Sequence, residues 1–242
     1  QEVESDQIKR TPLYQVHKDS GAKMIPFAGW EMPVWYTSVA EEHLATRQAA
    51  GLFDVSHMGV YQVEGLEALP FLDSVCANDL GTLELGDSTY THFLDPHANV
   101  LDDFIVYRRA KDVYIVVVNS SNDDKNWTCL NAVKEGKVMI DVNHPSAKVY
   151  GRNCKLRNLR DPKEGPDMRV DIALQGPKSR EILLSLGADP ETRKKITALK
   201  RTHLCEVTLS GFDLIISRTG YTGEKWSFEI FVHPDRVVEF WN

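Results

Sequence analysis

Residues 101–107 place two adjacent carboxylates, Asp102 and Asp103, at the start of an apolar run that ends in Tyr107. A short apolar run of this kind predicts a buried strand. Because side chains alternate along a strand, Asp103 and Tyr107 share one face while Asp102 points to the other. The segment therefore predicts either an ordinary Asp-Asp turn into a strand or a carboxylate held beside an aromatic hydroxyl on a buried sheet.

Alternating and β-branched runs predict further strands, and capping residues predict helices between them. The expected strands cover residues 60–64, 90–94, 103–107, 113–118, 170–174, 204–209, 212–217 and 227–232. The expected helices cover residues 39–48, 68–77 and 123–133, with two more after Pro177 and Asp235. Residues 11–36, rich in aromatics, glycine and proline, are expected to form an irregular packed loop. This interspersed order predicts an α+β fold with antiparallel sheets and flanking helices.

The length and charge of the chain limit what it can bind. With 242 residues it is long enough for one large domain or two small ones. A formal net charge of −7 argues against nucleic acid or an anionic membrane as a partner held through bulk charge. No apolar run approaches the roughly 18 residues of a membrane helix. Residues 1–10 are acidic and polar, unlike a signal peptide or an Arg-rich presequence.

Cysteine and histidine positions give no metal signature. The four cysteines are far apart and form no C-x-x-C pair, and the eight histidines have no metal-like spacing. We therefore expect no metal site and free thiols in a reducing compartment, either bacterial cytoplasm or mitochondrial matrix. Glycine-rich nucleotide motifs and the G-x-S-x-G nucleophile motif do not occur, which disfavours nucleotide-binding and hydrolase classes.

Residues 148–169 differ in composition from the rest of the chain. They hold seven basic and three acidic side chains, a local charge of +4 in an acidic chain, and several glycines and prolines that break regular structure. The segment predicts either a solvated surface loop or a docking surface for an anionic partner.

Eight stretches occur in the same order as in the T-protein of the glycine cleavage system, the folate-dependent aminomethyltransferase family, and together they resemble it over nearly the whole chain. Each stretch alone is a weak signal, whereas eight in register are a strong one. The matching residues are 11–14, 27–33, 51–58, 77–79, 101–107, 117–119, 174–177 and 219–224.

The resemblance implies a specific reaction. A lipoylated carrier protein presents an aminomethyl group on sulfur, tetrahydrofolate accepts the one-carbon unit, and ammonia is released. Positive charge develops at an iminium-like carbon, and a fixed carboxylate beside the reacting nitrogen stabilises that charge and orients the nucleophile. By resemblance this catalytic group is Asp103.

The resemblance also implies the residues of a folate site. Glu229 would accept the parallel amino and ring N–H donors of the pterin as a bidentate pair. Tyr90, Tyr107 and Tyr221 would form aromatic walls for the flat rings, although the first two also suit a plain core or hairpin. Asn119 matches a family position at the ligand, and the same residue is well placed to cap the following helix.

Three departures from the family pattern bear on this site. Ala98-Asn99 replaces a Gly-Gly pair in the turn before Asp103. One extra residue precedes Glu229, which inverts every later side chain of a strand unless a bulge absorbs it. The family's C-terminal β-barrel, and an Arg-containing part of the folate site, are expected to lie outside this sequence.

By the same resemblance, residues 1–54 and 144–242 form a discontinuous first folate-binding domain, and residues 55–143 form an inserted second domain. Two other functions remain open. The same folate domain occurs fused to flavin enzymes such as dimethylglycine or sarcosine dehydrogenases, which would place a flavin domain outside this sequence. A non-catalytic folate-binding relative ranks last, because the Cys-containing signature of such relatives is absent and Asp103 is present. Binding to a lipoylated carrier would separate the first function from these two.

Overall fold

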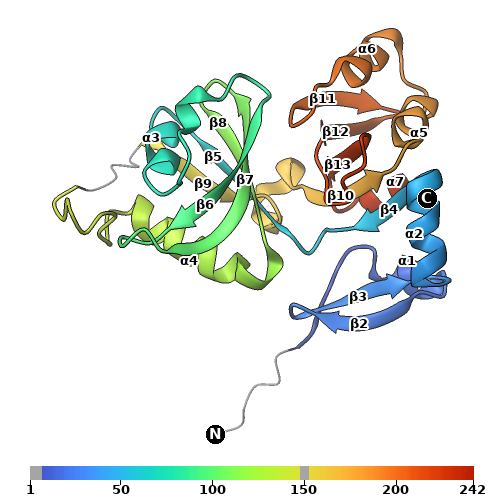
Figure 1. Ribbon diagram of the computed structural model, residues 1–242, viewed down its shortest axis with the longest axis horizontal. Helices are drawn as coiled ribbons and strands as arrows, with labels where there is room; N and C mark the ends of the chain where they lie inside the picture. The colour runs from blue at the N-terminus through green and yellow to red at the C-terminus, as the bar shows by residue number, and fades with distance from the viewer. Residues whose placement is uncertain (1–6, 148–152) are drawn as a thin grey trace, which may run out of the picture.

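Two five-stranded antiparallel sheets face each other in the computed structural model, which describes residues 7–147 and 153–242 (Figure 1). The first sheet has the order β11-β12-β13-β10-β4, and the second has the order β6-β7-β8-β5-β9. The first comprises β4 (Gly51–Asp54), β10 (Val170–Gln175), β11 (Leu204–Leu209), β12 (Phe212–Ser217) and β13 (Ser227–Val232). The second comprises β5 (Gly59–Glu64), β6 (Ser88–Leu94), β7 (Val100–Ala110), β8 (Val113–Val118) and β9 (Lys155–Asn158).

The two sheets have the same connectivity. In each, one strand is followed by a helical segment, a meander of three strands returns to lie beside that first strand, and an edge strand completes the sheet. Helices cover the outer faces: α3 (Ala68–Asp73) and α4 (Asp123–Lys134) on the second sheet, and α5 (Ser179–Ser185), α6 (Pro190–Ala198) and α7 (Val237–Trp241) on the first. The predicted α+β class with antiparallel sheets and flanking helices is confirmed. Among the described residues, no helix is long and apolar enough to span a bilayer.

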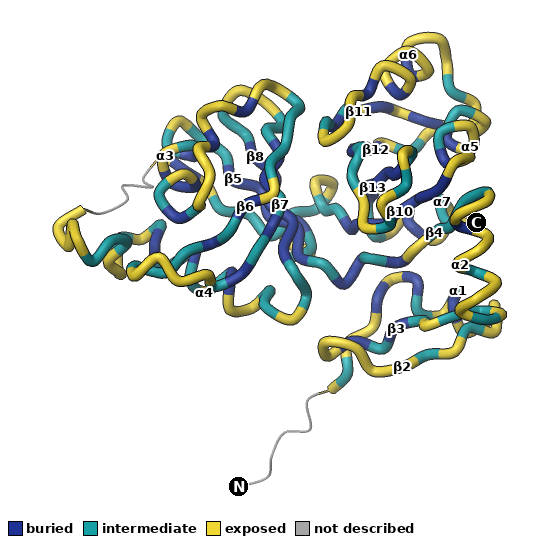
Figure 2. Tube along the Cα trace, viewed as in Figure 1, coloured by how far each residue is buried: buried dark blue, intermediate teal, exposed yellow. Residues whose placement is uncertain are grey.

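Each sheet packs one face against its helices and the other against the second sheet, because side chains alternate along its strands. Buried residues are concentrated in these strands (Figure 2). On β7, Phe104 and Val106 face the helices, whereas Ile105 and Tyr107 face the other sheet. The core between the sheets, which we call the seam, consists of Val60, Tyr107, Ile115, Val117, Leu159, Leu204, Ile215 and Phe231. Polar groups of either sheet that point into this seam are therefore brought together.

The predicted strands all occur, and the predicted helix over residues 39–48 is α2 (Val39–Gln48), with the Ser38 hydroxyl accepting from the Glu41 amide at 3.2 Å. The helix expected over residues 68–77 ends early, at Asp73. The reason is competition from strand β6, because Ala77 donates its backbone N–H to the carbonyl of His92 and Cys76 forms a β-bridge with Phe93.

The irregular loop expected over residues 11–36 is wrong. The segment holds α1 (Tyr14–Asp19) and a hairpin of β2 (Lys23–Phe27) and β3 (Trp30–Trp35), with β1 (Lys9–Arg10) beside β3. At the hairpin turn, Ala28 and Gly29 both have left-handed backbones, with φ of 49° and 80°. Two consecutive left-handed residues give a tight hairpin turn the twist that matches its strands. Gly29 therefore marks the turn between β2 and β3.

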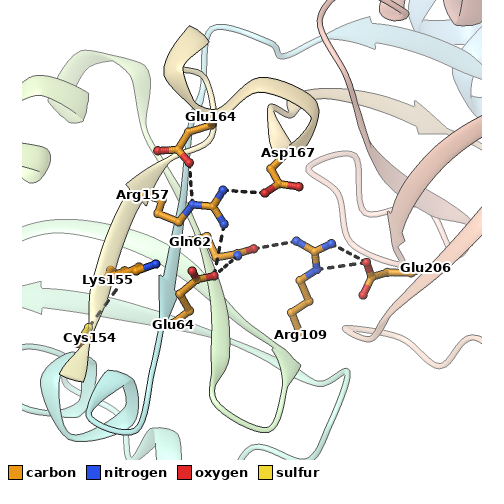
Figure 3. Close-up of polar contacts among 9 residues, drawn as sticks. All are labelled: Gln62, Glu64, Arg109, Cys154, Lys155, Arg157, Glu164, Asp167 and Glu206. Carbon is orange, nitrogen blue, oxygen red and sulfur yellow. Dashed lines mark hydrogen bonds and ion pairs between the residues drawn. The ribbon is translucent and has the colours of Figure 1, made fainter.

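The basic segment is also more regular than expected. Within its described part, residues 153–169, β9 pairs with β5 and a 3-10 segment covers Pro162–Asp167. The Arg157 guanidinium donates to Glu164 and Asp167, both at 2.7 Å, and lies 3.4 Å from Glu64 (Figure 3). These contacts neutralise Arg157 internally, which removes it from the charge available to an anionic partner.

The Arg109–Glu206 ion pair joins the two sheets at the seam, and Gln62 of the second sheet holds Arg109 in place. Arg109 on β7 donates to Gln62 on β5 at 2.7 Å and to Glu206 on β11 at 2.6 Å (Figure 3). The pairing of β9 with β5 also carries the second sheet to Asn158, beyond the expected domain boundary at residue 144.

Candidate functional site

Asp103 projects from β7 and is held by groups on both neighbouring strands. In the ladder with β6, His92 lies opposite Asp103, so Tyr90 is its diagonal neighbour on the same face. The Tyr90 hydroxyl donates to Asp103 Oδ2 at 2.7 Å, and this bond raises the pKa of Tyr90. Asn119, at the end of β8, donates from Nδ2 to Asp103 Oδ1 at 3.3 Å and to its carbonyl at 3.1 Å. Asp103 is thus fixed in orientation while remaining partly exposed.

The expectation that Asn119 caps the following helix is wrong. A 3-10 turn, Ser120–Asn122, comes between Asn119 and α4, and the Asn119 side chain makes no cap hydrogen bond. It turns back to β7 because two aspartates there offer acceptors. Asn119 is therefore a positioning residue for Asp103.

Asp102 points the opposite way, as strand alternation predicts. It is buried against α4 and accepts hydrogen bonds from Asn119 at 3.0 Å and from Asn126 at 2.6 Å. The two adjacent carboxylates therefore have different roles: Asp102 fastens β7 to α4, and Asp103 faces the seam.

The turn that leads into β7 is built without the expected Gly-Gly. Ala98 takes the left-handed conformation, with φ of 62°. Asp95 stabilises the turn by accepting from the amides of His97 at 2.8 Å and Asn99 at 2.9 Å. The side-chain bonds of Asp95 offset the strain of a non-glycine residue at positive φ.

Glu229 enters the seam from the other sheet. It is 1% exposed, and its Oε2 accepts from the hydroxyl of Thr219 and, at 3.4 Å, from that of Tyr107. Its Oε1 is buried without a hydrogen-bond partner among the described residues. The register of β13 with β10 is unbroken from Ser227 to Val232. The extra residue is therefore absorbed in the loop before β13, and Glu229 keeps the face that points into the seam.

The Tyr107 hydroxyl donates to Glu229, and its side chain does not line an open pocket. Its ring is completely buried, and its hydroxyl lies 2.9 Å from the Thr219 hydroxyl. Burial and the neighbouring Glu229 raise its pKa well above the ordinary value. By contrast, Tyr90 and Tyr221 are 58% and 63% exposed and line one cavity of about 360 Å³. Of the three predicted aromatic walls, these two are accessible to a ligand.

Tyr221 is near enough to both carboxylate groups for their charges to act on its hydroxyl. Partial burial raises its pKa, and the charges of Glu229 and Asp103 act in the same direction. The loop that carries it is shaped by Gln175, which accepts from the Thr222 hydroxyl at 2.8 Å. Gly220 is required in this loop, because a Cβ there would lie 2.1 Å from Gln175 Oε1.

Asp171 is a seam residue that the sequence analysis did not identify. It is fully buried on β10, and no amide, hydroxyl or cationic donor of the described residues bonds its carboxylate; when protonated, Asp171 can donate to the Glu229 carboxylate. Its partner in the ladder is Phe231, which makes it the diagonal neighbour of Glu229 on the same face. Burial and Glu229 raise the pKa of Asp171 well above its usual range. The sequence signal for this residue is a carboxylate within the apolar strand pattern of residues 170–174, where an aspartate is unusual.

A larger cavity, of about 470 Å³, lies elsewhere and holds none of the predicted site residues. Its polar part is the buried His17, whose Nε2 lies 2.8 Å from Asp54 Oδ2. Thr11 also donates to Asp54 at 2.7 Å, so this network fastens the N-terminal hairpin to β4. Within the described ranges, no group of three or more His, Cys, Asp or Glu side chains is arranged to hold a metal ion.

Two paired antiparallel sheets, with a partly exposed carboxylate on one and a buried carboxylate on the other, define the class of domain to which this chain belongs. Residues 13–242 match the family described as the GCVT N-terminal domain, and the chain belongs to this family. The aminomethyltransferase of Symbiobacterium thermophilum is 40% identical over 98% of this chain and 58% of its own length. That of Bacillus subtilis is 37% identical over 97% of this chain and 57% of its own length.

Solved structures give the same fold. The glycine cleavage system aminomethyltransferase T from Bartonella henselae superposes with a TM-score of 0.79 at 33% identity, covering 96% of this chain and 56% of that one. Heterotetrameric sarcosine oxidase from Corynebacterium sp. U-96 has a TM-score of 0.52 at 10% identity, covering 96% and 90%, which shows likeness of fold alone. The chain thus spans a little over half the length of the aminomethyltransferases that it matches.

Proposed function

We propose that the chain is the folate-binding part of an aminomethyltransferase of the glycine cleavage system. Asp103 is its catalytic carboxylate, and Glu229 is its pterin-binding carboxylate. The observation that carries the proposal is the convergence of these two carboxylates, from different sheets, on a seam that also bears Tyr90 and Tyr221. Neither residue has a cationic side chain as an ion-pair partner within the described ranges, so their charge is available for a ligand.

Tetrahydrofolate fits the donor and acceptor set of this seam. A buried acceptor without a partner is costly, and Glu229 Oε1 is such an atom. The pterin edge offers two parallel N–H donors, the geometry that one carboxylate accepts. Tyr90 and Tyr221 supply exposed aromatic faces in the adjoining cavity. When bound, tetrahydrofolate supplies the nitrogen nucleophile that receives the one-carbon unit.

Asp103 contributes electrostatic stabilisation and orientation. Tyr90 and Asn119 hold its carboxylate from two sides, so little reorganisation is needed as positive charge develops in the transition state. Tyr90 neutralises none of the charge, because it is a neutral donor. A lipoylated carrier protein is the proposed donor partner, and ammonia is the proposed second product.

The proposal includes the two-unit organisation expected from the family. The first sheet and the N-terminal hairpin form one unit, and the second sheet forms the other, inserted between β4 and β10. We extend the inserted unit from residue 143 to Asn158, because β9 is hydrogen-bonded to β5.

Titration calorimetry of tetrahydrofolate tests the proposal. The wild-type chain is expected to bind tetrahydrofolate. The Asp103→Asn variant should bind it more weakly, with a Kd raised by less than about tenfold. The control Asp213→Asn, which changes an exposed aspartate on β12, should bind like wild type. Aminomethyl-carrier turnover, followed by ammonia release, should fall only in Asp103→Asn. A folded chain that binds no tetrahydrofolate would contradict the proposal.

A further inference from the structure

Two carboxyl groups, Asp171 of β10 and Glu229 of β13, lie next to each other on the seam face of the first sheet. Both are enclosed, with exposures of 0% and 1%. In the β10–β13 ladder Asp171 is opposite Phe231 and Glu229 is opposite Ala173, so the two carboxyl groups are diagonal neighbours. They lie within reach of a hydrogen bond between the two side chains. We call Asp171 and Glu229 the acid pair.

No cation compensates the acid pair within the described part of the chain. The side chains that face it are Tyr107 from β7, Ser217 from β12, Thr219 and Tyr221 from the loop before β13, and, by its charge, Asp54 from β4. Each of these is neutral or acidic. Two buried carboxylates without a positive neighbour repel each other and lose their hydration, so they do not both ionise near neutral pH. The surroundings of the acid pair therefore favour one shared proton.

The hydroxyl donors decide which member of the pair carries the charge. Thr219 and Tyr107 donate to Glu229 Oε2, and hydrogen bonds to a carboxylate favour its ionised form. Asp171 has no such donor among residues 7–147 and 153–242, and burial together with the charge of Glu229 raises its pKa well above the usual range. The proton is thus more stable on Asp171, where the O–H can donate to the Glu229 carboxylate.

We propose that the acid pair holds a single proton, which resides on Asp171, and that Asp171 thereby positions the Glu229 carboxylate for the N–H donors of its ligand. The proposal rests on the proposed function, since Glu229 is the proposed pterin acceptor. Asp171 itself does not line the 360 Å³ cavity, so it acts on the ligand through Glu229.

The hydrogen bonds of Glu229 explain why one more donor matters there. The hydroxyls of Thr219 and Tyr107 hold Oε2, and no amide, hydroxyl or cation of the described residues fixes Oε1. A carboxylate accepts about four hydrogen bonds, so an O–H from Asp171 adds a second anchor and leaves acceptor capacity for a ligand. An acceptor fixed in this way has less orientational freedom to lose on binding, which favours affinity.

Infrared difference spectroscopy of the folded chain at neutral pH tests the shared proton. Subtracting the spectrum of Asp171→Asn from that of wild type should reveal the carbonyl band of one protonated carboxyl group, which shifts when D2O replaces water. The control Asp213→Asn changes an exposed aspartate on β12. Its difference spectrum should show an ionised carboxylate, as for an ordinary aspartate in water.

Calorimetric titration with tetrahydrofolate tests the positioning role. Asp171→Asn keeps a neutral N–H donor beside Glu229, so its Kd should stay within about twofold of wild type. Asp171→Leu fills the site without a donor, so its Kd should rise about fivefold to tenfold. The control Ile172→Val removes buried apolar volume from the helix-facing side of the same strand. It should lower stability and leave the Kd unchanged. Urea unfolding identifies the variants that are folded.

Results of two kinds would overturn the proposal. A difference spectrum of Asp171→Asn without a protonated carboxyl band removes the shared proton. A folded Asp171→Leu chain that binds like wild type, or an Asp171→Asn chain that binds as weakly as Asp171→Leu, removes the positioning role. If the folded wild type binds no tetrahydrofolate, the proposed function fails, whereas the infrared spectra still decide where the proton resides.

Discussion

The two sheets have the same strand order but hold their carboxylates in opposite environments. Asp103 is partly exposed, and its donors are the side chains of Tyr90 and Asn119. Glu229 is buried, with one oxygen bonded by hydroxyls, the other without a partner, and a second carboxyl group, Asp171, diagonal to it. One sheet presents an oriented, partly exposed carboxylate beside Tyr90, and the other encloses an acceptor.

This difference suits two separate tasks. A charge that must stabilise a transition state has to be reachable by the reacting atoms and already oriented. An acceptor that must discriminate one ring edge is most selective when it is desolvated and has no other donor, since the wrong ligand then leaves it unpaired. Substitutions at each carboxylate should therefore change different measured quantities.

The largest expected effect is on turnover in Asp103→Asn. The neutral amide keeps the shape of the side chain and removes the fixed charge, so kcat should fall by about 10²–10³. Tetrahydrofolate affinity should change far less. Ammonia release from an aminomethyl-lipoyl carrier gives kcat, and an unchanged kcat would remove Asp103 from catalysis.

Glu229→Gln should instead weaken binding. The amide places an N–H donor against the pterin donors, and a buried mismatch of this kind should raise the tetrahydrofolate Kd by about 30-fold to 100-fold. The matched control is Glu239→Gln, which alters an exposed carboxylate that pairs with Arg236 at 3.1 Å on α7, outside the cavity. If both variants bind equally, Glu229 is not the pterin acceptor.

Asp171→Asn should change how stability depends on pH. Burial and Glu229 raise the pKa of Asp171 in the folded chain. The stability that protonated Asp171 contributes is therefore fully present below the pKa of the unfolded chain, about 4, and is lost as the pH rises through the pKa of the folded chain. The asparagine cannot ionise. We therefore expect the variant to gain about 1 kcal/mol over wild type at pH 8, with a smaller gain at pH 5.

Urea unfolding at the two pH values measures this difference. A variant that is destabilised equally at pH 5 and pH 8 would mean that Asp171 does not titrate between them. Val170→Asn, at the neighbouring buried position that faces the helices, is the matched control and should destabilise at both pH values.

Tyr90→Phe should give the smallest effect. It removes one of the two side-chain donors that orient Asp103, while Asn119 remains. We expect kcat to fall by about threefold to fivefold, with the ring contact and hence the folate Kd preserved. A fall as large as that of Asp103→Asn would make the Tyr90 hydroxyl part of the chemistry.

The sequence predicted the strand positions and the placing of Asp102 and Asp103 on opposite faces of β7, because strand alternation is a local property. The hairpin at Ala28-Gly29 differs from the irregular loop that the sequence predicts, because glycine also occurs at tight turns between strands. The helix cap assigned to Asn119 failed because two acceptors on β7, distant in sequence, compete for the amide. The Asp171–Glu229 neighbourhood depends on the pairing of β10 with β13, and no local pattern encodes that pairing.

The entry and exit of the second sheet lie side by side. Asp54 is opposite Ile172 where the chain leaves and re-enters the first sheet, and Tyr61 is opposite Asn158 within the second. The second sheet is thus a cassette with adjacent ends. Residues 59–158 can therefore be cloned as a separate unit. Alternatively, the ends of this unit can be joined and the chain opened at another loop, which gives a circular permutant. Because the second sheet lies between the edge strand β4 and the continuous β10–β13 unit, it interrupts the first sheet at a single edge pairing, that of β4 with β10.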